Sequence, residues 1–579
     1  MSQYFIGLST SGHDPSIAVV NDAGEVIFAE STERYLQDKR AWGALPDQVM
    51  HLAPVFAQII KEDPEARFQM ASSWAKDKTQ SFIGSDNTFI SESVNEWMRN
   101  IHHEVQSFAG RNLKFILNER LNIDIWRYEH HLCHAVNAVY SSPFSTAACL
   151  VLDGEGDVGA ASLYHFNQGQ LTRVWRSWGP GSLGTFYAWA TGLCGFTATA
   201  GEEWKVMGLA AYGKARETWV ERLCGLMNVV EGRIEWADKS VIDATLAYFA
   251  SAVPNPHLKH PDVPDLAASA QAAFSYYAQQ IIQDVYTSLP EKRLIYTGGC
   301  ALNSSFNGTI TTQTSFEQVH VPSAPGDDGN AIGAALLAWQ QYMTQHRSNT
   351  KKDAMQPQDT VDLPYGFTLP YLGSKPSKAE VSKLHAFQSP LHITKVKHSG
   401  ATEVAALLAK GKIVGVMRGA AEMGPRALGH RSILANPCIA DMKDTINRLV
   451  KGRENYRPFA PVVPETELAN WFVNPQPSPY MSFTLRFRED KETLVPAVVH
   501  ADGTGRVQSV STNNAPWLHE CVWAFAQHTQ IPVLLNTSFN VMGKPIVHSV
   551  NDAVGMLLST GLDAVLIGDV LIAKCELPC

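Results

Sequence analysis

Two stretches of the chain share one pattern of hydrophobic and polar residues. Residues 4–34 consist of three apolar, β-branched runs separated by "GHDPS" and "DAGE", which have the composition of turns. Residues 147–178 repeat this plan, with strand-like runs separated first by a turn rich in Gly and Asp and then by "NQGQ". Each stretch predicts a three-stranded meander, and the pair predicts an internal duplication.

Helical patterns and a glycine turn follow the second repeat. Apolar residues recur at helical spacing over residues 265–289, from Ala270 to Val285, until Pro290 ends the pattern. Residues 293–308 predict a strand that opens into a Gly298-Gly299 turn, where backbone N–H groups can approach an anion or a ribose. A duplicated meander interleaved with helices resembles the actin, sugar-kinase and chaperone ATPase (ASKHA) fold group, whose two lobes hold a nucleotide.

A second α/β domain is expected after a linker. Residues 346–365 are polar and charged and contain Pro357, so they predict a linker between domains at 1–345 and 366–579. Residues 377–388 and 401–419 predict helix, helix and strand, and residues 530–573 alternate strand and helix. Residues 60–125 carry no motif and are expected to form an insert of helices and loops that selects the substrate.

Composition narrows the class of protein. The 579 residues are too many for one core, and 45% hydrophobic with 18% charged residues is typical of a folded chain. A net charge of −9 without a basic block argues against a nucleic-acid partner. The nine cysteines form no CxxC pair, and neither a signal peptide nor an apolar run of membrane length is present. A cytoplasmic protein with reduced thiols is therefore expected.

The segment "RYEHHLCHAVNAVYSS" carries candidate metal chemistry. His130 and His134 are four residues apart and would project from one face of a helix, whereas His131 would point elsewhere. Asp153 ends the first strand of the second meander, and Asp327 lies in a turn before a helix. Two His and two Asp suit Fe or Zn, and the carboxylates also admit Mn or Mg. The alternative is a helix start with buried, hydrogen-bonded histidines.

The whole chain resembles the ATP-dependent carbamoyltransferases of natural-product and nodulation-factor biosynthesis. In this family a domain similar to threonylcarbamoyltransferase is followed by one similar to threonylcarbamoyladenylate synthase (YrdC-like). The matching strings, in order, are "GHDPSIAVV", "TERYLQDKR", "HHLCHA", "LVLDGEGD", "SLGTFY", "EEWKVMGLAAYG", "TGGCALN", "GDDGNAIGAAL", "GPRALGHRSIL", "VKGRENYRPFAPVV", "HADGTGRVQSV" and "LNTSFNVMGKPIV". The order of the strings makes the resemblance specific.

The resemblance implies two reactions in two sites. Carbamoyl phosphate is hydrolysed in the C-terminal domain and the carbamate is joined to ATP as carbamoyladenylate. The N-terminal domain then passes the carbamoyl group to a hydroxyl of a small molecule of secondary metabolism. The implied metal ligands, with iron the first choice, are His130, His134, Asp153 and Asp327, and the implied nucleotide contacts are Gly154, Lys205, Gly298, Gly299 and Asn303.

Basic residues of the second domain suit this chemistry on physical grounds, because a phosphate dianion and a triphosphate need convergent, bidentate donors. They are Arg426, Arg431, Lys451, Arg453, Arg457 and Arg506. Asn536, Ser538 and Asn540 follow an apolar strand, where a hydroxyl and amides would face a ligand crevice. For the basic residues, the alternative is a solvated surface paired with Glu422 and Glu454. For Asn536, Ser538 and Asn540, the alternative is a simple Asx or Ser turn.

The transfer step needs a base near neutral pKa for the acceptor hydroxyl. His13, with Asp14 to orient it, is the candidate, and its alternative is a turn-capping histidine. Lys39 matches the family lysine and is expected to stabilise the carbamoyl oxygen. Asp38 and Arg40 depart from the family pattern, which has a basic residue and a His at these positions, so recognition of the acceptor in this loop is in question.

Two other functions compete with carbamoyl transfer. A small-molecule kinase of the same fold group would have no need for the HxxxH pair or the C-terminal arginines. The many basic residues in glycine-framed turns argue against a non-catalytic ATP-dependent binding or scaffold protein. The hydrogenase-maturation relatives carry an acylphosphatase domain and CxxC zinc fingers that are absent from this sequence, and the tRNA-modifying relatives divide the two activities between chains. The expected partner is a small-molecule acceptor, with neither nucleic acid nor membrane, and a homodimer is possible.

Overall fold

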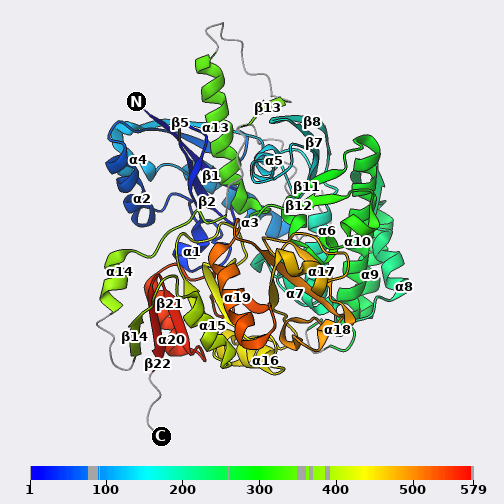
Figure 1. The fold of residues 1–579 in the computed structure, drawn as a ribbon. Coiled ribbons are helices and arrows are strands. Elements are labelled where there is room, and N and C mark those ends of the chain that lie inside the picture. The colour runs from blue at the N-terminus through cyan, green and yellow to red at the C-terminus, as the bar shows by residue number, and fades with distance from the viewer. Residues whose placement is uncertain are drawn as a thin grey trace. The chain divides into compact units, whose positions relative to one another are not determined.

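The computed structural model describes residues 2–75, 89, 92–254, 256–257, 260–347, 360–363, 370–384 and 391–574. The chain forms two compact units (Figure 1). Unit 1 comprises the described residues within 1–33, 40–303 and 309–368, and unit 2 comprises those within 34–39, 304–308 and 369–579. Each unit has its own sheets and hydrophobic core.

The first sheet of unit 1 contains the first predicted meander. Its strands, in spatial order, are β3 (Val26–Ser31), β2 (Ser16–Val20), β1 (Gln3–Ser9), β4 (Arg67–Ser72) and β5 (Leu121–Arg127). β1, β2 and β3 are antiparallel, whereas β4 and β5 run parallel to β1. β4 and β5 lie largely within residues 60–125, so the expected insert of helices and loops is wrong there. The strand sequence "RFQMAS" lacks β-branched residues and alternates poorly, which hid it.

The second sheet repeats the order of the first. Its strands are β12 (Gln318–His320), β11 (Arg293–Thr297), β6 (Thr146–Leu152), β7 (Ala161–Asn167), β8 (Gln170–Arg176) and β13 (Thr360–Asp362). The series β8-β7-β6-β11-β12 corresponds to β3-β2-β1-β4-β5, which confirms the duplication. β13 pairs with β8 inside the segment that was expected to be a linker, so this part of 346–365 belongs to the sheet.

One helix packs closely on the first sheet and also on the helix that lies between the two repeats. Side chains alternate along β1, so Ile6 and Leu8 pack in the core with α2 (Val49–Glu62) and α4 (Leu113–Leu117), while Gly7 faces α13 (Asn330–Arg347). A Cβ atom at Gly7 would lie 1.9 Å from the Ala331 carbonyl oxygen. α13 also packs on α5 (His130–Tyr140), where a Cβ at Gly333 would lie 2.0 Å from the Cys133 carbonyl oxygen. Figure 1 shows α13 running along β1.

Further helices of unit 1 are α3 (Glu92–Phe108), α6 (Leu183–Leu193), α7 (Glu203–Ala210), α8 (Glu217–Cys224), α9 (Lys239–Ala252), α10 (Val263–Ser288) and the short α12 (Ile310–Gln313). α10 matches the helix predicted over 265–289, and the predicted apolar positions on it are buried. A two-stranded ribbon, β9 (Met227–Val230) with β10 (Arg233–Trp236), completes this region.

Unit 2 is built on a nine-stranded mixed sheet. Its strands, in spatial order, are β14 (Leu391–Lys395), β22 (Val570–Lys574), β21 (Ala564–Ile567), β15 (Val414–Met417), β16 (Arg431–Ala435), β20 (Leu534–Ser538), β17 (Ala460–Pro464), β19 (Thr504–Val510) and β18 (Phe483–Arg486). α15 (Ala401–Ala409) and α19 (Pro516–Thr529) lie side by side against this sheet, where Leu408 and Phe525 share one core with Val416 (Figure 1).

The predicted fold class, an α/β duplicated first domain followed by an α/β second domain, is confirmed. The helix predicted over 377–388 is observed as α14 (Lys378–Lys383), with a capping box between Ser377 and Glu380, and residues 385–388 lie outside the described residues. α20 (Val550–Ser559) and the strands beside it follow the prediction for 530–573.

Two short segments from the first predicted domain belong to unit 2, so the units differ from the continuous ranges 1–345 and 366–579. In the segment 304–308, Asn307 Nδ2 donates to the Ser482 carbonyl at 3.0 Å. A Cβ at Gly308 would lie 1.9 Å from the Thr484 carbonyl oxygen, so this segment packs directly on β18. The segment 34–39 is described with the second site below.

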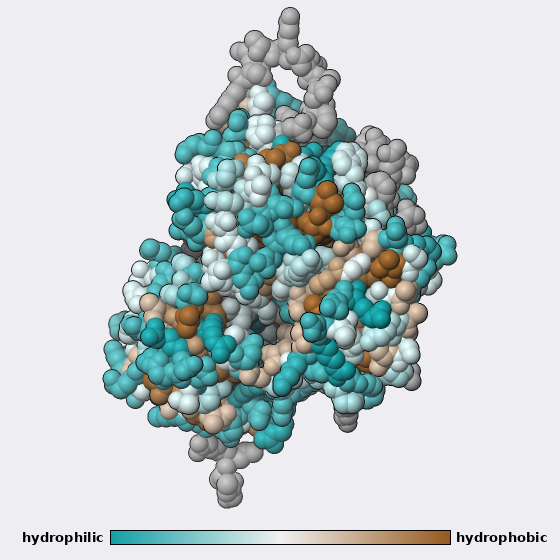
Figure 2. Space-filling model, turned by 90° about the vertical axis from the view of Figure 1, so that its right-hand side faces the viewer, coloured by the Kyte–Doolittle hydropathy of each residue, from teal (hydrophilic) through white to brown (hydrophobic). Residues whose placement is uncertain are grey.

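The surface has ordinary polarity. On the face shown in Figure 2, hydrophobic residues form small separate groups and not one continuous band. Among the described helices, none combines the length and the apolar character required to cross a membrane.

We predict that Gly7→Ala destabilises unit 1 by about 1–3 kcal/mol, because the added methyl group forces α13 away from β1. Gly192→Ala is the matched control: it lies within α6, and a Cβ there meets nothing within 4 Å. Thermal melts of both variants check this. Equal melting temperatures for Gly7→Ala and the wild type would contradict the packing described.

Candidate functional site

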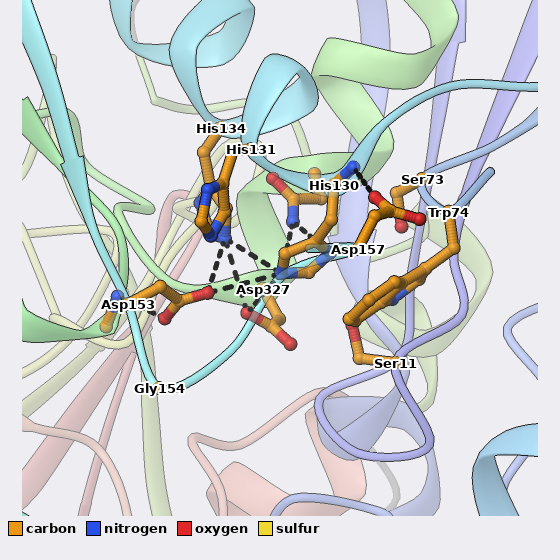
Figure 3. A network of polar contacts seen from close by, with 12 residues as sticks. Ser11, Ser73, Trp74, His130, His131, His134, Asp153, Gly154, Asp157 and Asp327 are labelled. Carbon is orange, nitrogen blue, oxygen red and sulfur yellow. Dashed lines mark hydrogen bonds and ion pairs between the residues drawn. The ribbon is translucent and has the colours of Figure 1, made fainter. Parts of the chain in front are cut away.

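The HxxxH pair lies at the start of a buried helix in unit 1. α5 begins at His130, whose backbone N–H donates to Asp157 Oδ2 at 2.6 Å, while Asp157 Oδ1 accepts from the Ala75 N–H at 3.0 Å. A carboxylate at a helix N-terminus is favourable, because it satisfies an N–H group without an intrahelical partner. His130 and His134 are both buried, with their Nε2 atoms 3.2 Å apart (Figure 3).

Two carboxylates from other elements converge on these imidazoles. Asp153 follows β6, and its Oδ2 lies 3.2 Å from Nε2 of both histidines. Asp327 lies at the turn before α13, and its Oδ1 lies 3.5 Å from His130 Nε2 and 3.4 Å from His134 Nε2. The helix prediction for the HxxxH pair and its proximity to both aspartates are thus observed (Figure 3).

The donor set fits a divalent metal ion. Ligands about 2.0–2.1 Å from a tetrahedral metal are separated by about 3.3 Å. The two imidazole Nε2 atoms lie 3.2 Å apart, and their distances to the carboxylate oxygens span 3.2–3.5 Å. Two imidazoles and two carboxylates, almost shielded from water, match the preferences of Fe or Zn.

The pKa values of these four side chains also indicate that the site favours a positive charge. Burial by itself would raise the pKa of the Asp327 carboxyl, but His130 opposes it and holds that pKa well below its ordinary value. Burial would lower the pKa of His130, but the Asp327 and Asp153 carboxylates raise it to about 10. The aspartates therefore stay ionised and favour a positive charge beside them.

Several residues around the histidines were not singled out by the sequence. The Trp74 ring stacks on His130, with centroids 4.1 Å apart, and Trp74 Nε1 donates to Ser11 Oγ at 3.0 Å. Asn330 places its side-chain nitrogen 3.3 Å from His130 Nδ1. No local pattern marks these residues, because each comes from a different element.

His131 points away from the pair, as predicted. Its Nδ1 lies 2.9 Å from Ser162 Oγ on β7, and burial lowers its pKa to about 3. A neutral, hydrogen-bonded histidine of this kind is structural.

The glycine turn after β11 supports Asp153. The Gly299 N–H donates to Asp153 Oδ1 at 2.8 Å, which leaves Oδ2 facing the histidines. Gly298 has φ +91°, and a Cβ there would lie 2.2 Å from the Leu152 carbonyl oxygen, so only glycine fits. Gly154 also lies beside Asp153, where Ser182 Oγ donates to its carbonyl at 2.8 Å.

The two other residues proposed for the nucleotide occupy defined networks. Asn303 Nδ2 donates to Gln271 Oε1 at 3.0 Å, and that oxygen also accepts from the Tyr187 hydroxyl at 2.7 Å. Lys205 forms an ion pair with Glu202 at 2.5 Å. Their contact with a nucleotide stays a prediction.

The candidate base lies beside a metal-site carboxylate. His13 Nδ1 lies 2.9 Å from Asp14 Oδ2 and 3.9 Å from Asp327 Oδ2. Arg40 also joins this group: its Nη2 lies 2.9 Å from His13 Nδ1 and 3.0 Å from Asp14 Oδ2. Burial would raise the pKa of Asp14, but Arg40 and His13 outweigh it and lower that pKa. Lys39 belongs to the segment 34–39 of unit 2.

Unit 2 concentrates positive charge at a second site. Burial lowers the pKa of the Arg506 guanidinium well below its ordinary value, and three neighbouring guanidinium groups lower it further. These neighbours are Arg426, Arg453 and Arg457. Burial also lowers the pKa of Arg426, to about 10. These buried cations outnumber the nearby carboxylate of Glu454, an arrangement that favours the binding of an anion.

Lys451 lies at the edge of this group, at the end of the π-helical turn Asn447–Lys451. It is buried, and its Nζ donates to the carbonyl of Ser538, to Ser538 Oγ at 3.3 Å and to Asn540 Oδ1 at 2.8 Å. Burial lowers its pKa well below the ordinary value, and Arg453 and Arg457 lower it further. The structure therefore brings together most of the basic and amide residues predicted for this site.

Family models match both halves of the chain. Residues 4–336 match the model described as carbamoyltransferase N-terminus, and residues 405–574 match the one described as carbamoyltransferase C-terminus. The chain belongs to the carbamoyltransferase family.

Individual relatives extend over nearly the whole chain. The carbamoyltransferase is 32% identical to nodulation protein NolNO of Sinorhizobium fredii, over 98% of this chain and 80% of the relative. It is 27% identical to 3'-hydroxymethylcephem-O-carbamoyltransferase of Amycolatopsis lactamdurans, over 98% of each chain. A ROK family protein from Streptococcus pneumoniae is similar in structure, with 12% identity, a TM-score of 0.30 and coverage of 60% of this chain and 100% of that chain.

Two residues predicted to bind phosphate are used differently in this carbamoyltransferase. The Arg431 guanidinium is fully buried and donates to backbone carbonyls, including those of Arg418 at 2.9 Å and Ser374 at 2.8 Å. Asn536 Nδ2 donates to the Ala427 carbonyl at 3.0 Å and to Gln508 Oε1 at 2.7 Å. Both side chains hold neighbouring loops, and their direct contact with a phosphate stays a prediction.

Within the described residues, the alternative of a basic group paired with an acid is observed at Arg457. Arg457 Nη1 lies 3.4 Å from Glu454 Oε2. Glu422, by contrast, is 1% exposed and accepts backbone N–H groups. It is part of the interior of the site.

We predict that the purified carbamoyltransferase binds a divalent ion and that His134→Ala lowers its affinity for Fe²⁺ or Zn²⁺ about 100-fold or more, because one of the donors is lost. Metal analysis after dialysis measures this. His131→Asn is the matched control, since His131 is buried on the same helix but faces Ser162. An equal loss of metal in both variants would contradict the assignment.

Proposed function

We propose that the chain is an ATP-dependent O-carbamoyltransferase. Unit 2 forms carbamoyladenylate from carbamoyl phosphate and ATP, and unit 1 transfers the carbamoyl group to a hydroxyl of a small-molecule acceptor. Membership of the carbamoyltransferase family and the likeness to a cephem O-carbamoyltransferase support transfer to a hydroxyl. We also propose that the enzyme works in the cytoplasm, without a nucleic acid or membrane partner.

The observation that carries the proposal is the group of buried cations in unit 2. Burial lowers the pKa values of Arg506 and Lys451, and neighbouring guanidinium groups lower both further, so the protein alone holds these cations at a cost. Carbamoyl phosphate and the triphosphate of ATP supply the negative charge that this arrangement lacks. A small-molecule kinase would use the nucleotide site of unit 1 and would leave this group without a purpose.

The proposed chemistry in unit 2 is a sequence of two displacements. Carbamoyl phosphate is hydrolysed to carbamate and inorganic phosphate. A carbamate oxygen then bonds to the α-phosphorus of ATP, while the bond from that phosphorus to the oxygen of pyrophosphate breaks and pyrophosphate leaves. Arg426, Arg457 and Arg506 are proposed to bind the oxygens on which negative charge accumulates, and Lys451 is proposed to orient these oxygens.

In unit 1 the acceptor oxygen bonds to the carbamoyl carbon, the bond from this carbon to the AMP phosphate oxygen breaks, and AMP leaves. His13 is proposed to take the hydroxyl proton, and Asp14, whose Oδ2 lies 2.9 Å from His13 Nδ1, orients the imidazole. A divalent ion, when held by His130, His134, Asp153 and Asp327, supplies positive charge and Lewis acidity. The role of Lys39 at the carbamoyl oxygen stays a prediction.

The first test is an assay without acceptor. Purified protein, ATP, carbamoyl phosphate and Fe²⁺ are incubated, and carbamoyladenylate is measured by mass spectrometry. We expect the product with wild type and with His130→Ala, and a loss of about 100-fold or more with Arg426→Ala, because an unscreened phosphate charge then faces fewer donors. Consumption of ATP with an alcohol but without this product would support a kinase.

A second prediction concerns the base. His13→Gln leaves carbamoyladenylate formation unchanged and slows carbamoyl transfer to an accepted alcohol about 10²- to 10⁴-fold, because proton removal is lost. His165→Gln is the control, since His165 pairs with Glu291 at 3.0 Å on the outside of the second sheet and is partly exposed. Unchanged transfer by His13→Gln would assign the proton to another group.

A further inference from the structure

The loop that carries Arg426 joins β15 to β16 in unit 2, and backbone contacts hold it on most sides. The Met423 N–H donates to the Pro370 carbonyl at 2.6 Å, and the Tyr371 hydroxyl donates to the Leu428 carbonyl at 3.2 Å. Gly424 and Gly429 have φ values of +110° and +112°, so the backbone turns sharply on both sides of Arg426. The direction of Arg426 therefore depends on how these turns are fixed.

Glu422 fixes the second half of the loop from inside. Its Oε1 accepts the N–H groups of Leu428 at 2.7 Å, His430 at 2.7 Å and Arg431 at 3.1 Å. The carboxylate is 1% exposed, so these bonds form away from water and are correspondingly strong.

The first half of the loop is held by a residue from the N-terminal part of the sequence. Arg34 is 2% exposed, and its Nη2 donates to the Gly424 carbonyl at 2.6 Å. The Arg34 charge also acts on Glu422, whose pKa is lowered by His430, Arg34 and Arg431 against the effect of burial. Arg34 thus provides both a donor for the strained glycine and a countercharge for the carboxylate behind it.

The rest of the segment 34–39 supports the other side of the anion site. Gln37 Nε2 donates to the Ile546 carbonyl at 3.1 Å, and Lys544 Nζ donates to the Gln37 carbonyl at 3.1 Å. The Lys544 carbonyl accepts from Nδ2 of Asn540, whose Oδ1 accepts from Lys451. One short segment therefore contacts the loop of Arg426 and the loop that orients Lys451.

We propose that Arg34 is a positioning residue of the anion site in unit 2, acting on Arg426 through the Gly424 carbonyl. The inference deepens the proposed function and rests on it: residues 34–39 lie within the range matched by the N-terminal family model, yet they complete the site at which carbamoyl phosphate is activated. Arg34 does not touch the substrate. It sets where the Arg426 guanidinium can meet the phosphate.

The test compares Arg34→Met and Arg34→Lys in the full chain by the acceptor-free assay. We expect Arg34→Met to raise the KM for carbamoyl phosphate about tenfold or more with a smaller change in kcat, because a displaced loop weakens binding of the phosphate. Arg34→Lys restores part of the affinity, since its ammonium keeps a charge and a donor. Arg120→Met is the control: Arg120 donates to the Pro64 carbonyl at 2.6 Å in unit 1.

A second readout does not depend on the reaction. Pyrophosphate is expected to raise the melting temperature of wild type and of Arg120→Met, and to do so less for Arg34→Met. The proposal would be overturned if Arg34→Met had the same KM as the wild type and the same rise in melting temperature with pyrophosphate. This holds even if the variant without ligand melts at a lower temperature. A wild type that makes no carbamoyladenylate but shows a pyrophosphate shift that Arg34→Met loses would overturn the proposed function and sustain the positioning role.

Discussion

Like charges held close together and away from water require a counter-ion. Each unit of this carbamoyltransferase contains one such group of like charges among its predicted site residues. In unit 1 the Asp153 and Asp327 carboxylates converge on two imidazoles, and in unit 2 guanidinium groups crowd Arg506. Coulomb repulsion between buried like charges is weakly screened, so such arrangements persist only where the surrounding fold holds them. A metal cation in unit 1 would reduce the repulsion between the carboxylates, and phosphate groups in unit 2 would reduce the repulsion between the guanidinium groups.

The fold meets this requirement with backbone contacts and tight packing. Asp157 fixes the start of α5, the Gly299 N–H fixes one oxygen of Asp153, and Glu422 gathers three N–H groups behind Arg426. Gly7 and Gly333 let α13 approach β1 and α5, which places Asp327 opposite the histidines. The ligands and the arginines thus depend on residues that do not themselves meet a substrate.

A large part of the fold could be predicted from local patterns. Both meanders, the helix over 265–289 and the HxxxH face depend on periodicity within a few residues, and all are observed. The strands β4 and β13 were missed, because "RFQMAS" has little β-branched character and "TVD" is short and polar. Their pairing partners lie far away in the sequence, and pairing decides whether such segments become strands.

The sequence by itself determined the duplicated α/β architecture, the identity of the metal-binding candidates and the set of basic residues available to bind phosphate, because these follow from composition and local spacing. Tertiary structure alone decided how each long polar side chain is used. Arg426 and Arg506 lie close together with little negative charge near them. Arg431 and Arg34 instead donate hydrogen bonds to backbone carbonyls. The local sequence around an arginine does not identify its partners. Its role depends on which carbonyls or charges, distant in the sequence, the folded chain brings within hydrogen-bond distance.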